Sequence, residues 1–174
     1  ERIQDEGLTS ELLQESSNAL SDRIDSLLLN CDVGNWATIL SDGLRIDIIK
    51  RKSQYFQNKE GPFEAIQRTG ENMKGQTCQL RKSWFYKHLP NGEKVLRKWM
   101  VYSPSKNSLF CFCCRLFTLQ NKEAAGVSKF ITGFQNWWKV NPKVSQHENY
   151  DDHLNNFEKW KTLEASLELN KTID

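Results

Sequence analysis

The sequence predicts an α+β fold in which a small β-hairpin packs against helices. Residues 99–102 and 109–112 are rich in strand-forming side chains, and the connector between them is rich in turn-forming Ser, Pro and Asn. Residues 127–140 carry aromatic residues at helical spacing, and residues 154–167 carry a second apolar stripe at that spacing. One face of the first helix can therefore pack on the hairpin.

The two predicted helices are defined by their apolar residues and by the residues at their ends. The apolar face of the first comprises Phe130, Phe134, Trp137 and Trp138. We expect Asn141-Pro142 to end it, because the residue before a proline is driven out of the helical conformation. We expect the second helix to begin near Asn149, a suitable N-cap. Its stripe comprises Leu154, Phe157, Trp160, Leu163 and Leu167.

The N-terminal part of the chain is acidic. Residues 1–49 contain three Lys/Arg against ten Asp/Glu, and the first thirty show only a weak helical pattern. Such a segment is expected to be partly disordered or to serve as a docking arm. We expect its structure to be mostly irregular or helical. The predicted organisation is therefore an acidic N-terminal segment at 1–49, a central domain at 50–153 and a C-terminal helix at 154–174.

The central region is strongly basic and indicates a nucleic-acid partner. Residues 50–143 contain eighteen Lys/Arg against five Asp/Glu, a net charge of +13 within a chain of net charge +2. A solvated basic surface without a partner is the alternative interpretation. The candidate contacts to DNA phosphates are Arg81, Lys82, Arg97, Lys98, Lys106, Arg115, Lys129, Lys139 and Lys143.

The cysteine content indicates a reducing compartment. The chain has five cysteines, an odd number, and three of them fall between residues 111 and 114. This crowding suits metal binding better than a secreted disulfide framework. No apolar run is long enough to cross a membrane, and the first six residues do not resemble a signal peptide. We therefore expect a location in the nucleus or cytosol.

The cysteine cluster also predicts one structural zinc ion. Cys111-x2-Cys114 is followed, after thirty-two residues, by His147-x5-His153, and tetrahedral zinc needs four sulfur or nitrogen ligands. Cys113 is expected to point away, because adjacent residues on an extended segment face opposite sides, although it could replace Cys114. Buried structural cysteines and a redox-active Cys-x2-Cys motif are the alternatives.

Several motifs resemble the TTF-type zinc finger of hAT-superfamily transposases and transposase-derived proteins, including zinc finger MYM-type protein 1-like sequences. They are Asp32-Val33-Gly34-Asn35-Trp36, Trp99-Met100-Val101-Tyr102-Ser103-Pro104, Phe110-Cys111-Phe112-Cys113-Cys114-Arg115-Leu116-Phe117, Gly133-Phe134-x2-Trp137, His147-Glu148-x4-His153 and Trp160-Lys161-x-Leu163-Glu164. Val33 departs from the pattern, which usually has Pro there.

This resemblance implies a DNA-binding zinc finger in a nuclear protein. It places the zinc ligands on Cys111, Cys114, His147 and His153 and makes residues 50–153 the finger domain. Residues 154–174 would then be the helix and linker that lead toward a transposase domain. The catalytic acids of that domain would lie beyond Asp174.

Two functions compete at this stage. The first is duplex DNA binding, with the exposed face of residues 134–143 as a candidate groove reader. The second is a protein-interaction or dimerisation module that uses the terminal segments. An enzymatic role is not expected, because the chain shows no nucleophile–base pair or phosphate loop and the zinc would have no open position. No catalytic residue and no small-molecule substrate is therefore assigned.

Overall fold

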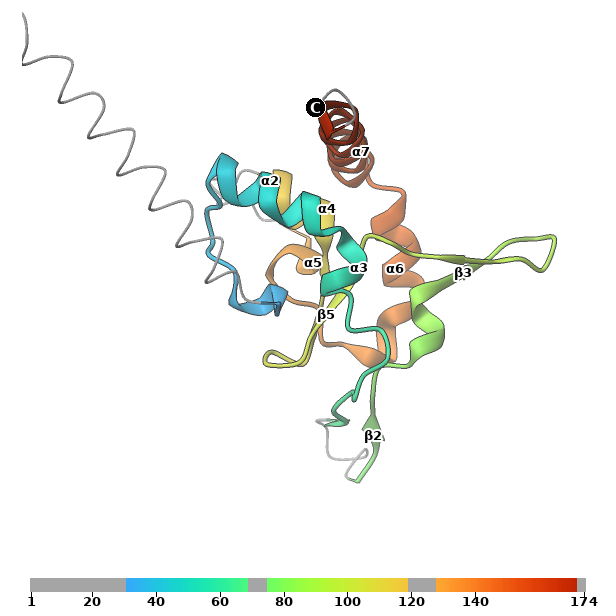
Figure 1. Cartoon of the computed structure of the whole chain (residues 1–174). Helices are drawn as coiled ribbons and strands as arrows, with labels where there is room; N and C mark the ends of the chain where they lie inside the picture. The colour runs from blue at the N-terminus through green and yellow to red at the C-terminus, as the bar shows by residue number, and fades with distance from the viewer. Residues whose placement is uncertain (1–30, 69–74, 119–127, 172–174) are drawn as a thin grey trace, which may run out of the picture.

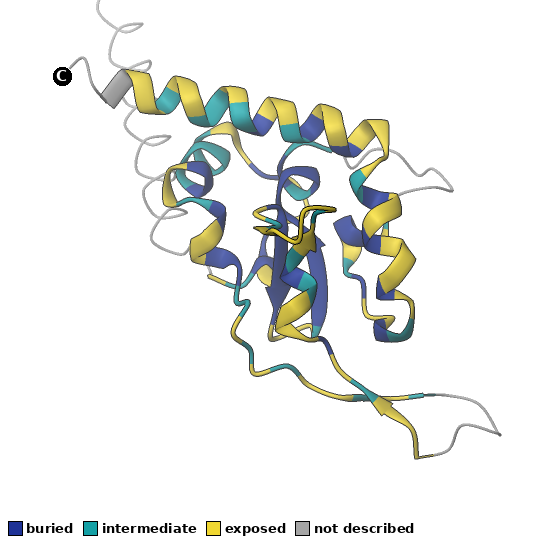
Figure 2. Cartoon of the chain, turned by 90° about the vertical axis from the view of Figure 1, so that its right-hand side faces the viewer, coloured by how far each residue is buried: buried dark blue, intermediate teal, exposed yellow. Residues whose placement is uncertain are grey.

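A buried hairpin lies at the centre of the fold. The computed structural model of the chain describes residues 31–68, 75–118 and 128–171. Strands β5 (Met100–Ser103) and β6 (Ser108–Cys111) pair antiparallel, with Met100 opposite Cys111 and Ser103 opposite Ser108. Every residue of both strands is buried, because other elements cover both faces of the hairpin (Figure 2). The predicted α+β class and its central hairpin are confirmed.

Helices follow the hairpin and hold its end. Helix α4 (Phe112–Phe117) begins directly after β6 and packs against α7 (Asp151–Lys171), and α5 (Lys129–Thr132) packs against β6. Figure 2 shows α7 as a long helix running across the top of the molecule. Its Trp160 is 1% exposed and contacts Phe112 of α4, with ring centroids 5.0 Å apart. The predicted C-terminal helix is therefore part of the core packing.

Residues 33–56 also contribute to this core. They form η1 (Val33–Asn35), α2 (Asp42–Arg51) and α3 (Ser53–Phe56), and η1 and α3 contact β5. Val33, Ile48 and Phe56 are fully buried. The prediction that the acidic segment is partly disordered concerns mainly residues 1–30, which lie outside the described residues.

The prediction of a single aromatic helix over residues 127–140 is wrong. Helix α5 ends after one turn, at Gly133 with φ +115°, and Phe134 exchanges two backbone hydrogen bonds of 2.9 Å with Leu109. A Cβ at Gly133 would lie 3.2 Å from the Ser108 side chain, so the chain can approach β6 this closely only with glycine. Strand pairing therefore replaces the helix, while the aromatic residues Phe130, Phe134 and Trp137 are still buried.

The predicted break before Pro142 is present, although a further helix follows it, whereas the predicted helix start at Asn149 is wrong. After η4 (Trp137–Lys139), α6 spans Val140–Glu148, but Asn141 has a non-helical φ of −96° and ψ of 126°, so a kink precedes Pro142 and Pro142 begins the regular part of the helix. Proline is tolerated there because the first helical N–H groups have no partner within the helix. The Asn149 side chain donates to the Ser145 carbonyl and therefore closes α6, whereas α7 begins after Tyr150.

Two further hairpins extend from the core. One pairs β1 (Ile66–Gln67) with β2 (Thr77–Cys78), and the other pairs β3 (Tyr86–His88) with β4 (Lys94–Leu96), after η3 (Lys82–Phe85). Figure 1 shows the β3–β4 hairpin projecting far from the body of the molecule. None of the helices in the described residues has the length and apolar character needed to cross a membrane.

Candidate metal centre

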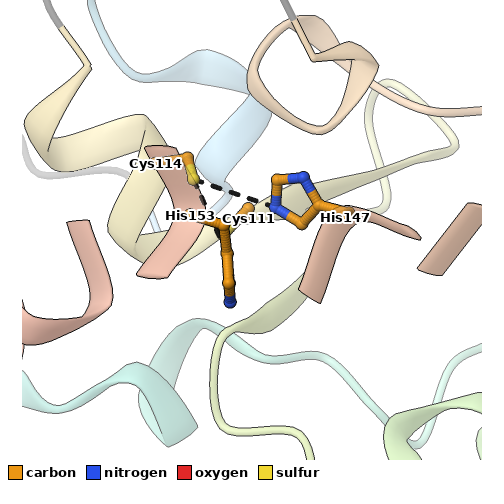
Figure 3. Close-up of side chains that lie close together, drawn as sticks. All are labelled: Cys111, Cys114, His147 and His153. Atoms are coloured by element: carbon orange, nitrogen blue, oxygen red, sulfur yellow. Dashed lines mark hydrogen bonds between the residues drawn. The ribbon is translucent and has the colours of Figure 1, made fainter. Parts of the chain in front are cut away.

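Four different elements bring the predicted zinc ligands to one point. Cys111 ends β6, Cys114 lies within α4, His147 lies in the last turn of α6 and His153 lies in the first turn of α7. Both histidines therefore come from helices. The ligand atoms all lie within 4.8 Å of one another, and all four residues are at most 4% exposed (Figure 3).

The distances between these atoms fit a tetrahedral zinc ion. Zinc–sulfur bonds of about 2.3 Å and zinc–nitrogen bonds of about 2.0 Å, at tetrahedral angles, place sulfur and nitrogen about 3.5 Å apart. The Cys111 Sγ–His153 Nδ1 distance is 3.4 Å, Cys114 Sγ–His153 Nδ1 is 3.7 Å and Cys114 Sγ–His147 Nε2 is 3.8 Å. The donor set and its spacing therefore suit zinc.

Each histidine presents a different ring nitrogen to the site. His147 faces Cys114 with Nε2, and its Nδ1 lies 3.0 Å from the Ser128 hydroxyl. When Nε2 binds a metal, Nδ1 carries the proton and Ser128 accepts it, which fixes the ring orientation. His153 faces the sulfurs with Nδ1. Ser128 is thus a supporting residue that the sequence pattern did not reveal.

Aromatic side chains enclose the site. The Trp99 ring lies 5.2 Å from both the His147 and the His153 ring centroids, and the Phe130 ring lies 4.6 Å from that of His147. These rings pack directly against the two imidazoles. Four protein ligands in such a setting leave no open position, which is characteristic of structural zinc.

The predicted orientation of Cys113 is wrong. Its sulfur lies 3.4 Å from Cys111 Sγ and 3.8 Å from His153 Nδ1, and the residue is fully buried. The prediction assumed an extended backbone, but α4 begins at Phe112 and turns residue 113 back toward the cluster. Three thiols and two imidazoles therefore lie together. The other cysteines lie outside it, Cys31 on the surface and Cys78 half-buried.

The three thiols differ in how easily they lose a proton. Burial raises the pKa of Cys111 and of Cys113 well above the usual thiol value. Hydrogen bonds from Cys111 and Cys113 lower the pKa of the Cys114 thiol. A divalent cation would favour deprotonation of the buried thiols, because its positive charge compensates for the hydration that a buried thiolate lacks.

A polar network beside His147 was missed by the sequence reasoning. Glu148 accepts hydrogen bonds from Arg97 Nε at 2.9 Å and from Trp99 Nε1 at 3.1 Å. Arg97 also donates to the Trp84 and Tyr86 carbonyls. The one available signal was the position of Glu148 directly after a predicted ligand. This network connects the metal centre to the base of the β3–β4 hairpin.

The nine predicted phosphate contacts fall into two groups. Arg97 is turned inward, with 10% of its side chain exposed, and Arg115 donates to the Trp36 and Ala37 carbonyls. The other seven residues are exposed and distributed over several elements and loops: Arg81, Lys82, Lys98, Lys106, Lys129, Lys139 and Lys143. Lys82 forms an ion pair with Glu60 at 2.6 Å.

The chain has homologues among zinc finger proteins. It is 32% identical over 164 residues to zinc finger MYM-type protein 5 of Macaca fascicularis and 31% identical over 164 residues to the human protein. The match to the mouse protein is 31% over 153 residues. These alignments cover 94%, 94% and 87% of this chain, but only 22% of each relative.

The chain thus spans about a fifth of the length of the curated relatives it matches. No family model and no solved structure matches the chain. The homologues and the compact Cys/His cluster together support one structural zinc ion, as predicted. By these comparisons the chain is similar to part of the zinc finger MYM-type 5 proteins.

Proposed function

We propose that this chain is a zinc-dependent module that binds duplex DNA in the nucleus. The single observation that carries the proposal is the buried cluster of Cys111, Cys114, His147 and His153, whose two cysteines lie within residues 50–143, a region of net charge +13. In this proposal, residues 50–153 are the TTF-type finger of a hAT-like or transposase-derived protein. Residues 154–174 lead onward from it, and residues 1–49 form an acidic arm.

The role of zinc in the proposal is to hold separate elements together. Its four ligands come from β6, α4, α6 and α7, so one ion cross-links the central hairpin to three helices. Structural zinc sites contribute folding free energy directly, because the unfolded chain has no preformed site. Binding of DNA should therefore depend on zinc through the fold, without contact between the ion and the nucleic acid.

Exposed cations support DNA as the partner. Lys98, Lys106, Lys129, Lys139 and Lys143 are exposed and form no ion pair within the described part of the chain. Lysines without an ion pair can bind phosphates without first losing an ionic partner, although the Lys143 ammonium also donates to Gln146 at 3.1 Å. Such contacts provide affinity and orientation on the duplex rather than sequence specificity.

The proposal is tested by measuring duplex binding of the zinc-loaded chain by fluorescence anisotropy at several salt concentrations. We expect log affinity to fall linearly with log salt, with a slope of about −0.9 for each phosphate contact. Removal of zinc by a chelator should abolish binding, and re-addition should restore it. Absence of binding at low salt, or an affinity insensitive to salt, would contradict the proposal.

The competing role is a non-enzymatic protein-interaction or dimerisation module that uses the terminal segments. Deletion of residues 1–30 separates the two ideas, because it leaves every described element intact. DNA binding should persist in the truncated chain, and loss of the acidic segment should strengthen it. A truncated chain that changes from dimer to monomer, and a full-length chain that binds no DNA, would favour the competing role.

A further inference from the structure

The β3–β4 hairpin is built as an exposed ribbon. Its strands pair in the register Tyr86–Leu96, Lys87–Val95 and His88–Lys94. The turn is closed by hydrogen bonds of 2.9 Å from Leu89 N to Glu93 O and from Gly92 N to Leu89 O, with Gly92 at φ +86°. Positive φ is readily adopted by glycine, so the turn geometry is encoded locally.

Solvent surrounds the outer half of this ribbon. Lys87, His88, Lys94 and Val95 are exposed, and Val95 is 42% exposed although it is apolar. Figure 1 shows the ribbon extending away from the helices, and Figure 2 views it end-on in front of the core. An isolated two-stranded hairpin is at best marginally stable in water, so a projecting one needs an anchor at its base.

The anchor is the polar network beside the metal centre. The Arg97 N–H donates to the Phe85 carbonyl at 2.7 Å, and its guanidinium donates to the Trp84 carbonyl at 3.0 Å. The same guanidinium is held by Glu148 of α6 at 2.9 Å. The base of the ribbon is therefore fixed in orientation relative to α6, which carries His147. Such preorganisation lowers the entropy cost of placing the ribbon on a partner.

The charge of the ribbon fits a polyanion. Between residues 81 and 98 the sequence contains six Lys/Arg and one acidic residue, Glu93. Lys87 and Lys94 extend from opposite strands, and neither forms an ion pair in the described residues. Lys52, Lys82 and Lys161, by contrast, are paired with glutamates. The protruding ribbon therefore carries two exposed cations that form no ion pair within the described residues.

We infer that this ribbon enters the major groove of duplex DNA, where Lys87 and Lys94 contact the phosphates that flank the groove. The inference rests on the proposed function and identifies the element that carries it. The major groove is about 12 Å wide and admits a two-stranded ribbon, whose strands lie about 4.8 Å apart. The region 134–143, earlier a candidate groove reader, does not form one exposed helix.

The test compares two matched double variants of the zinc-loaded full chain. Lys87→Gln with Lys94→Gln removes the ribbon charges, and Lys50→Gln with Lys159→Gln removes two exposed, unpaired charges from α2 and α7. We expect the ribbon variant to bind duplex DNA at least about tenfold more weakly and to lower the salt slope by about two, whereas the control changes little. Zinc content and thermal unfolding should match the parent in both variants.

A second measurement locates the contact directly. A benzophenone side chain at Val95 should crosslink to duplex DNA on illumination, whereas the same group at Ile39, an exposed apolar residue (77%) that precedes α2, should not. Methyl green, which occupies the major groove, should prevent the crosslink, and netropsin, which occupies the minor groove, should not.

The outcomes separate the inference from the proposed function. If the parent chain binds DNA and the ribbon variant binds as tightly as the control variant, the ribbon inference is overturned and the proposed function stands. A Val95 crosslink to protein alone would likewise overturn it and identify the ribbon as a protein-docking element. If the parent chain binds no DNA, both fail together.

Discussion

Arg97 and Glu148 form an ion pair that is almost removed from solvent. The Nε–Oε1 distance is 2.9 Å, and the two side chains are 10% and 14% exposed. Arg97 precedes β5 and Glu148 ends α6, so the pair joins the base of the β3–β4 hairpin to the residue that follows a proposed zinc ligand. The Trp99 indole donates to the same carboxylate at 3.1 Å.

Breaking this pair should destabilise the fold strongly. Arg97→Met leaves the Glu148 carboxylate buried without its charged partner, and such changes cost about 3 kcal/mol or more. The comparison is Lys82→Met, which removes an exposed pair with Glu60 and should cause no measurable loss. Urea denaturation at a fixed zinc concentration gives both values. Equal effects of the two substitutions would show that the buried pair has no special role.

The sequence predicted the parts of this structure that depend on local pattern. The hairpin around residues 99–112 is visible because strand-forming residues flank a turn-rich connector. The Cys-x2-Cys and His-x5-His pairs were recognisable because soft ligands are rare and crowded. Neither inference required knowledge of distant contacts.

The features that were missed depend on tertiary contacts. Phe134 pairs with Leu109 instead of continuing a helix, and this choice depends on a neighbouring strand. Arg97 was counted as a surface cation, because nothing in its local sequence reveals a partner fifty-one residues away. Cys113 was placed outside the cluster, because its side chain was assumed to alternate with its neighbours as on a strand, whereas a helix begins at Phe112.

The Ser128 hydroxyl should increase the zinc affinity through His147. It lies 3.0 Å from the Nδ1 atom, and loss of such a supporting hydrogen bond typically weakens metal binding by about 10- to 100-fold. We expect Ser128→Ala to show this loss in a competition assay with a chromophoric chelator. Ser145→Ala, at an exposed position on α6, is the matched control and should leave affinity unchanged. A zinc affinity of Ser128→Ala equal to that of the parent chain would show that Ser128 does not support metal binding.

Zinc affinity should rise with pH over the neutral range. Burial raises the pKa of Cys111, so its thiol stays protonated at neutral pH and zinc must displace that proton. Each proton released makes the apparent affinity about tenfold higher per pH unit while the pH is below the thiol pKa. Titration calorimetry in buffers of different ionisation enthalpy counts these protons. Binding that releases no proton would contradict the assignment of Cys111 as a ligand.

Two neighbouring cysteines should respond differently to the same substitution. Cys114 Sγ lies within 3.8 Å of ligand nitrogens on both histidines, whereas Cys113 Sγ lies close to Cys111 Sγ and to His153 alone. We therefore expect Cys114→Ser to lose bound zinc and Cys113→Ser to retain about one ion per chain.

Elemental analysis of the two purified variants after dialysis measures this difference. Cys78→Ser, outside the cluster, controls for a general effect of losing a thiol. If Cys113→Ser loses the ion and Cys114→Ser keeps it, Cys113 is the fourth ligand. The helix that begins at Phe112 would then present residue 113 rather than residue 114 to the metal, and His147 would have to move toward that sulfur.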